Sequence, residues 1–272
     1  MTCEVMVTTT SRLYGVAMAA NALLRDWRTR RRMSQQEVSD RCGVSTRHLS
    51  YVETGRSTPS PELVLLLAET FDVPLRERNN LLVASGHAPR YHETSWDAPD
   101  MAAARDAVEH YLAALEPAPA VAVDRLWNLV SANASVGIFI DGVSPDLVLP
   151  TPNVIRLTLH PDGLQPRVVN FEETATEVVR RLDRQVALTG DAELAELLDE
   201  VKKYPGVPVV HGVEEPGAIF LPIRMLHEGE ELSFVSAITT FGTAVDISLA
   251  ELAIETFMPA DPLTRDRLYD LA

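Results

Sequence analysis

Five polar side chains, gathered on one predicted helix, have the chemistry needed to recognise the edges of DNA bases. Hydroxyl, guanidinium and imidazole groups donate or accept hydrogen bonds, and an arginine can bond guanine through two atoms at once. Helical spacing places these side chains on one outer face, which predicts a recognition helix that enters a DNA major groove. The residues of this face are Thr46, Arg47, His48, Ser50 and Tyr51.

Residues 34–57 carry the local signals that would position this face. Ser34 and Glu37 have the spacing of a capping box, in which each side chain satisfies a free backbone amide at a helix start. Gly43 suits the left-handed conformation that ends a helix. Ser45 can then cap the helix that follows. The segment is therefore predicted to form a helix-turn-helix.

Apolar spacing predicts that the two helices, over residues 35–42 and 46–53, cross and share a core. Ser39 is small enough to permit their close approach. An ordinary helical hairpin with a solvated polar face is the alternative, but the caps, the turn and the apolar spacing all favour the helix-turn-helix. The residues predicted to face inward are Val38, Cys42, Val44, Leu49 and Val52.

The same segment resembles the Cro/lambda-repressor type of helix-turn-helix. That family has a small residue, mostly alanine, at the position of Ser39 and glycine at the position of Gly43. Residues 53–60, ETGRSTPS, resemble the family's E-x-G-x-x-x-P-S exit from the recognition helix. The resemblance implies that this part of the chain binds double-stranded DNA at an operator.

Charge is distributed unevenly along the chain. The net charge of −15 opposes DNA binding, yet residues 12–90 contain 12 arginines and 8 acidic residues. Residues 91–272 contain 12 basic and 30 acidic residues, so only the first part is suited to touch phosphate. Further DNA contacts are predicted at Gln35, Gln36 and Arg56. Gln35 and Arg56 are expected to contact the phosphate backbone rather than bases.

Composition and motif searches exclude several classes of protein. No apolar run approaches the roughly 18 residues of a membrane span, and no secretion signal opens the chain. The two cysteines, Cys3 and Cys42, frame no disulfide scaffold, so a cytoplasmic location is expected. Nucleotide-binding glycine loops, nucleophile elbows and metal-ligand spacings do not occur. The chain is therefore expected to be no enzyme and to carry no cofactor other than a possible bound fatty acid.

The predicted organisation is a disordered tail over 1–16, a DNA-binding domain over 17–90, a linker over 91–103 and a second domain over 104–272. The first domain is predicted to be all-α, with a core shared by Leu63, Leu66, Leu67, Phe71 and earlier helices. Its five expected helices cover residues 17–32, 35–42, 46–53, 61–71 and 75–85.

The second domain is predicted to be α+β, with about five antiparallel strands and helices packed on one side of the sheet. A helix over 101–116 is a candidate spine or dimer contact, and residues 153–164 could form either a helix or a strand. The predicted strands lie within 117–133, 218–226, 232–241 and 250–258. The other predicted helices lie over 131–140, 168–188, 192–204 and from 262 onward.

Four segments of the second half resemble, in order, the MmyB-like family of bacterial transcriptional regulators. They are GHAPRYHETSWDAPDM, PAPAVAVDRLWNLVSAN, NVIRLTLHPDGL and LTGDAEL. That family joins a Cro-type helix-turn-helix to a PAS-like ligand-binding domain. The resemblance implies a regulator whose second domain binds a small apolar molecule, with fatty-acyl compounds the suspected class.

A pocket in the second domain would need an apolar wall and one polar group at its mouth. Arg156 and His160 are the candidates to bind a ligand carboxylate. Ordinary core packing is the alternative for each residue. The candidate wall residues are Trp127, Phe139, Phe171, Phe220, Met225, Phe234 and Met258.

Three functions compete at this stage. The first is a ligand-responsive DNA-binding regulator, expected to be a homodimer because one recognition helix covers only a few base pairs. The second is a DNA-binding protein whose second domain only dimerises or binds a protein partner. The third is a small-molecule enzyme.

Overall fold

The computed structural model describes residues 20–209 and 221–271. The chain divides into two compact units, with the boundary between Arg90 and Tyr91. The predicted disordered tail and the first residues of the first predicted helix lie outside the described residues, as does Phe220. No helix in the described ranges is long and apolar enough to cross a membrane.

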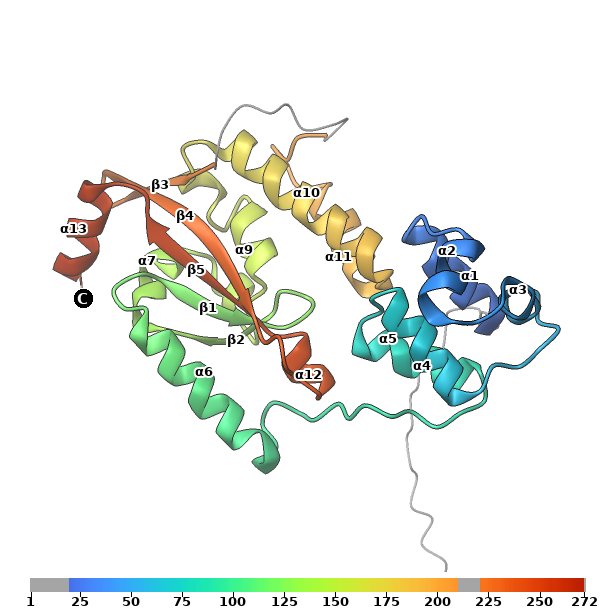
Figure 1. The fold of residues 1–272 in the computed structure, drawn as a ribbon. Helices are drawn as coiled ribbons and strands as arrows, with labels where there is room; N and C mark the ends of the chain where they lie inside the picture. The colour runs from blue at the N-terminus through green and yellow to red at the C-terminus, as the bar shows by residue number, and fades with distance from the viewer. Residues whose placement is uncertain (1–19, 210–220, 272) are drawn as a thin grey trace, which may run out of the picture. The chain divides into compact units, whose positions relative to one another are not determined.

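The first unit consists of five helices, as predicted (Figure 1). The capping box is confirmed: the Ser34 hydroxyl accepts from the Glu37 amide at 3.1 Å, and the Glu37 carboxylate accepts from the Ser34 amide at 2.6 Å. Gly43 adopts the left-handed conformation, with φ 66°. The helices are α1 (Ala20–Arg30), α2 (Gln35–Cys42), α3 (Thr46–Glu53), α4 (Pro61–Thr70) and α5 (Leu75–Ala84).

Each of the five helices contributes buried side chains to the core of this unit. Val38, Leu49 and Val52 are fully buried as predicted, whereas Cys42 and Val44 are only half-buried at the turn. The prediction that Leu66 is buried is wrong, because 39% of its surface is exposed. Val64 takes the inward position instead, since the buried stripe of α4 runs one residue away from the predicted one.

The second unit is built on a five-stranded antiparallel sheet with the strand order β2-β1-β5-β4-β3. The hairpin that joins β3 to β4 turns at Glu228 and Gly229, both with positive φ. Phe234 on β4 pairs with Ile223 of β3 and with Pro259 of β5, so the three strands share one register. The strands are β1 (Ala120–Val123), β2 (Leu129–Ala132), β3 (Ile223–His227), β4 (Glu230–Thr240) and β5 (Ala253–Pro259).

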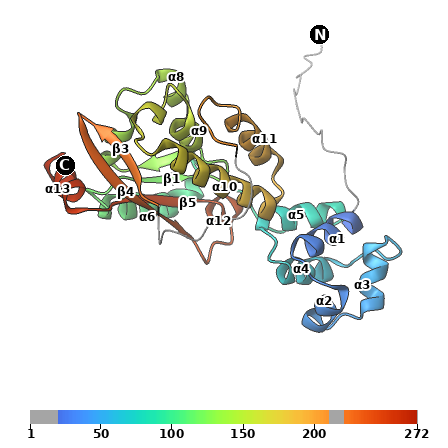
Figure 2. The ribbon, with the colours of Figure 1, turned by 90° about the horizontal axis from the view of Figure 1, so that it is seen from above.

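Helices cover both faces of this sheet, which corrects the prediction of a single covered side (Figures 1 and 2). Ala120 and Ala122 of β1 pack against α6 (Ala102–Ala114), while Val121 and Val123 face the opposite helical layer. Alternate strand residues point to opposite faces, so β1 is buried on both. The opposite layer contains α9 (Val154–Leu159), α10 (Phe171–Thr189) and α11 (Ala192–Val201).

Short helices complete the second unit. Residues 153–164 were predicted to form either a helix or a strand, and they contain the helix α9. The Asn153 side chain caps this helix by accepting a hydrogen bond from the backbone amide of Arg156. The elements not yet named are η1 (Pro99–Met101), η2 (Ala134–Val136), α7 (Gly137–Ile140), α8 (Pro145–Val148), η3 (Gln165–Arg167), α12 (Ile247–Ala250) and α13 (Pro262–Leu271).

The segment predicted as a linker, residues 91–103, packs against the second unit. The Thr94 hydroxyl donates to the Asp246 carboxylate at 2.7 Å, and the His92 carbonyl accepts from the Ile247 amide at 2.8 Å. The Trp96 side chain packs on the apolar cluster that contains Val108 and Leu112 of α6. The Trp96 carbonyl accepts a hydrogen bond from the Arg105 guanidinium. These contacts fix the chain that leads into α6.

Candidate functional site

The predicted recognition face lies on α3, at the surface of the first unit. Arg47 and His48 are exposed, and Tyr51 is half-buried between two arginines. The Arg47 guanidinium donates to the Tyr51 hydroxyl at 3.0 Å and lies 5.4 Å from the ring centre, and Arg56 lies 5.9 Å from the same ring. Tyr51 therefore holds two guanidinium groups at one surface, an arrangement suited to bases and phosphates. Thr46 and Ser50 are half-buried beside it.

The glutamines at the start of α2 have partners within the unit. The side-chain amide of Gln35 donates to the Glu53 carboxylate at 2.8 Å, and the side-chain amide of Gln36 donates to the Asp40 carboxylate at 2.8 Å. The structure thus places Gln35 partly in a structural role, whereas Gln36 remains exposed. Both still lie at the N-terminus of α2, where a backbone phosphate would meet positive helix charge.

A buried ion pair supports α3 from behind. Glu53, 5% exposed, accepts two hydrogen bonds from Arg28 of α1, at 2.6 and 2.9 Å. The hydrogen bond to Glu53 is the main reason that the pKa of Arg28 is raised. Among the arginines at the end of α1, Arg28 is thereby bound to the protein interior, and Arg31 donates to the Phe71 carbonyl at 2.6 Å.

The second unit contains a partly open, apolar cavity of about 70 Å³ between the sheet and the layer of α7 and α9. Of the predicted wall residues, Phe139 and Met225 line it. The Phe139 ring meets Phe257 edge-on with ring centres 4.9 Å apart. Thr158 is the one polar side chain among the lining residues that the structure describes. Such a wall suits a hydrocarbon chain and offers no partner for a charge.

Met258 was predicted to line the cavity, and the register shows that Phe257 does so instead. Phe257 pairs with Ser236 and Met258 pairs with Val235, so the two neighbours point to opposite faces. Met258 is 42% exposed. Phe234 is fully buried behind Phe139, at 5.5 Å between ring centres, and Phe171 packs on the core cluster of α10, so neither lines the cavity.

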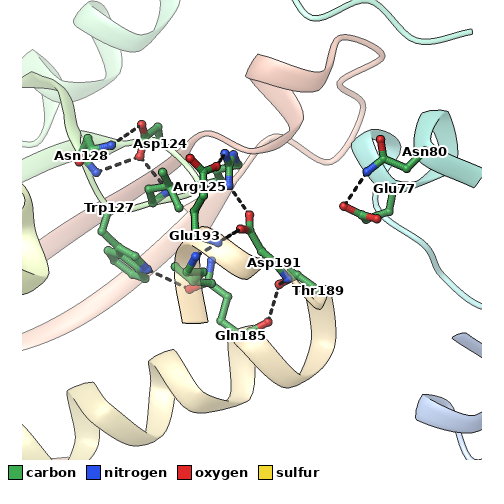
Figure 3. Close-up of polar contacts among 12 residues, drawn as sticks. Glu77, Asn80, Asp124, Arg125, Trp127, Asn128, Gln185, Thr189, Asp191 and Glu193 are labelled. Carbon is green, nitrogen blue, oxygen red and sulfur yellow. Dashed lines mark hydrogen bonds and ion pairs between the residues drawn. The ribbon is translucent and has the colours of Figure 1, made fainter. Parts of the chain in front are cut away.

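Trp127 is a core residue and does not line the cavity. It adopts a positive φ of 66° in the turn after β1, where the Asp124 carboxylate accepts from the amides of Leu126 and Asn128. Its indole N–H donates to Gln185 of α10 at 2.9 Å (Figure 3). Arg181 lies over the ring, 4.3 Å from its centre. Trp127 therefore links the β1–β2 turn to α10.

The two residues predicted to bind a ligand carboxylate are also engaged elsewhere. Arg156 forms a two-atom pair with Glu200, at 2.8 and 2.7 Å, and this hydrogen bonding lowers the pKa of Glu200. His160 meets the Tyr204 ring edge-on at 4.9 Å. Burial and the bond to Glu200 raise the pKa of Tyr204 to about 12. This cluster joins α9 to α11 and lies outside the cavity lining.

Several cavity residues were missed because they look like ordinary core residues in the sequence. They come from β1, β2, β3, β5, α9 and the segments around α7. All of them except Thr158 are apolar, and an apolar residue in the sequence carries no mark of a cavity. Alternate residues of β5 point to opposite faces of the sheet. The sequence would have identified Phe257 if the face that carries it, rather than the face that carries Met258, had been predicted to point inward. The missed lining residues include Val121, Leu157, Ile223 and Phe257.

Comparison with family models finds two matches. The model for the MmyB-like transcription regulator ligand binding domain matches residues 104–271, and a helix-turn-helix model matches residues 24–78. The search of curated proteins finds no match. The two matched regions correspond to the α+β unit with its cavity and to the helical unit with its recognition face. The chain therefore belongs to the MmyB-like helix-turn-helix transcription regulators.

Proposed function

We propose that the cavity of the second unit holds the hydrocarbon chain of a fatty-acyl compound, and that its occupancy changes the affinity of the first unit for DNA. The observation that carries this proposal is the apolar lining of the cavity, in which Thr158 is the single polar side chain among the described residues. Each buried CH₂ contributes roughly 0.8 kcal/mol, so a chain binds there with few polar contacts.

The size of the cavity sets a condition on the ligand. A volume of about 70 Å³ lies below the roughly 300–1,000 Å³ of ordinary ligand pockets, so a long chain requires its walls to part. Phe139, Leu157 and Ile223 come from three different elements, and their separation would displace the sheet relative to α7 and α9. Ligand binding is then coupled to a change of conformation, as regulation requires.

The coupling route we propose runs through α6. This helix packs on Ala120 and Ala122, on the face of β1 opposite Val121, which lines the cavity. The chain enters α6 from residues 92–98, which are fastened to Asp246 and Ile247. A shift of β1 therefore reaches the segment that follows the DNA-binding unit. In a PAS-like sensor that forms a homodimer, such a shift would alter the spacing of two recognition helices.

Solvent extraction of the purified protein followed by mass spectrometry tests the ligand directly. We expect an acyl compound to be recovered in roughly equimolar amount. Leu157→Trp, which fills the cavity, should abolish recovery, whereas Met258→Ala on the opposite face should leave it unchanged. Recovery of no amphiphile from either protein would favour the second function, in which this unit only dimerises or binds a protein.

A further inference from the structure

A second, polar space lies beside the apolar cavity. It is a cleft of about 360 Å³ between α10 and the strands β4 and β5. Glu177 and Arg181 line it from α10, and Ser236 and Glu255 line it from the sheet. Ile223 lines both the cleft and the apolar cavity, so the two spaces adjoin at this residue.

Glu255 is the unusual group in this cleft. Only 2% of it is exposed, although it lies in the middle of a strand and carries a carboxylate. Its Oε1 atom accepts from Arg181 at 2.7 Å and from the Ser236 hydroxyl. Its Oε2 atom is buried and has no hydrogen-bond partner among the described residues, and the same holds for Nε of Arg181. A buried acceptor and a buried donor are thus both left unsatisfied, which is costly unless something binds them.

The rest of the structure holds Arg181 in place. Its guanidinium lies over the Trp127 ring, which Gln185 fixes through the indole N–H. The turn that carries Trp127 is itself closed by Asp124 (Figure 3). The donor on Arg181 and the acceptor on Glu255 are therefore preorganised, as a binding site requires.

The buried pair of the cleft decides which head group fits. Glu177 accepts a hydrogen bond from Arg184 at 3.1 Å, so the groups left for a ligand are Glu255 and Arg181. A ligand carboxylate has no donor for Oε2 of Glu255 and would place one carboxylate beside another. An uncharged group that both donates and accepts would satisfy Oε2 of Glu255 and Nε of Arg181 together. A primary carboxamide has this chemistry, because its NH₂ donates and its carbonyl accepts.

We infer that the cleft binds the head group of the regulator's ligand, and that this head group is an uncharged carboxamide or similar donor–acceptor group rather than a carboxylate. This inference rests on the proposed function, in which the chain of the same ligand enters the apolar cavity. Movement of Ile223 joins the two spaces, and the cleft supplies the volume that the cavity lacks. It also explains why Arg156 and His160, bound to Glu200 and Tyr204, are not needed at the mouth.

Calorimetric titration of the full chain with decanamide and decanoic acid near neutral pH tests the inference, because the two share one hydrocarbon chain. We expect decanamide to bind about tenfold more tightly. Glu255→Gln removes the charge and should bring the two affinities within about threefold of each other. Met258→Ala, on the opposite face of β5, should keep the tenfold preference and serves as the control.

A second variant tests the same inference in case Glu255→Gln does not fold. In Arg181→Met/Glu255→Met the pair is replaced by apolar side chains, a change that buried pairs often tolerate. We expect it to bind both compounds without preference. Equal binding of both compounds by the natural protein, or tighter binding of the acid, overturns the head-group inference and leaves the proposed function intact. Binding of neither compound overturns the proposed function and the inference with it.

Discussion

The ion pair behind the recognition helix allows a quantitative prediction. Glu53→Ala removes three hydrogen bonds, two from Arg28 and one from Gln35. It leaves the guanidinium of Arg28, whose side chain is 15% exposed, without its carboxylate. Removing one partner of a buried pair typically costs about 3–5 kcal/mol, and the residual exposure of Arg28 favours the lower end, about 3 kcal/mol. Arg28→Met/Glu53→Met should lose much less, because no charge is left buried.

Hydrogen–deuterium exchange resolved over residues 20–84 measures this loss within the first unit alone. We expect core amides of α3 to open more easily by the stated amount in Glu53→Ala, and exchange in the sheet of the second unit to stay unchanged. A loss below about 1 kcal/mol would contradict this prediction, because it would show that solvent screens the pair as it screens an exposed ion pair. A matching loss in the double variant would refute it too, because shape rather than charge would then account for the effect.

Three further predictions concern DNA contact, the β1–β2 turn and pH. Arg47→Ala should weaken binding to a selected operator by roughly 1–3 kcal/mol and leave random DNA nearly unaffected, as measured by titration of labelled duplexes; equal losses would make Arg47 a phosphate contact. Asp124→Ala should cost about 1–3 kcal/mol in urea unfolding, because two backbone amides lose their acceptor, whereas Asp124→Asn should retain most of the stability. The lowered pKa of Glu200 means that its pair with Arg156 stabilises the fold above the unfolded-state pKa of 4.5 and that this stabilisation is lost as the pH falls through the folded-state pKa. Arg156→Gln should therefore lower the thermal midpoint at neutral pH but not at about pH 2, and an equal difference at both would exclude this linkage.

The first unit could be predicted closely because its signals are local. Ser34, Glu37 and Gly43 determine where α2 begins and ends through contacts within a few residues, and the structure confirms each. Leu66 was misplaced because α4 is apolar around much of its circumference, so its sequence does not determine which stripe turns inward. Tertiary packing, rather than helical period, selects Val64.

Several features of the second unit depend on contacts between residues that are far apart in the sequence. The strands could be found from alternation, but which face of β5 meets the cavity depends on its pairing with β4, which brings Phe257 inward and Met258 outward. The positive φ of Trp127 and its role beneath Arg181 depend on Asp124 and on the distant Gln185. A buried carboxylate such as Glu255 is equally invisible in a strand sequence, because its environment is assembled from α10 and β4.

Residues 91–103 give the same lesson for domain boundaries. Their weak periodicity predicted a linker, yet Thr94 bonds Asp246, 152 positions away, and Trp96 packs on the apolar cluster that includes Val108 and Leu112 of α6. Composition indicates where regular structure stops, and it does not indicate whether an irregular segment is packed.

The proposed regulation requires that a ligand in the second unit change the affinity of the first unit for DNA. An operator selected from random duplexes should be titrated with the full chain, with and without saturating decanamide or decanoic acid, whichever binds more tightly. We expect a pseudo-palindromic operator whose affinity changes by roughly 5- to 150-fold on ligand binding, and we expect no such change in Leu157→Trp. An operator affinity that stays the same while calorimetry shows the ligand bound would contradict the proposed regulation.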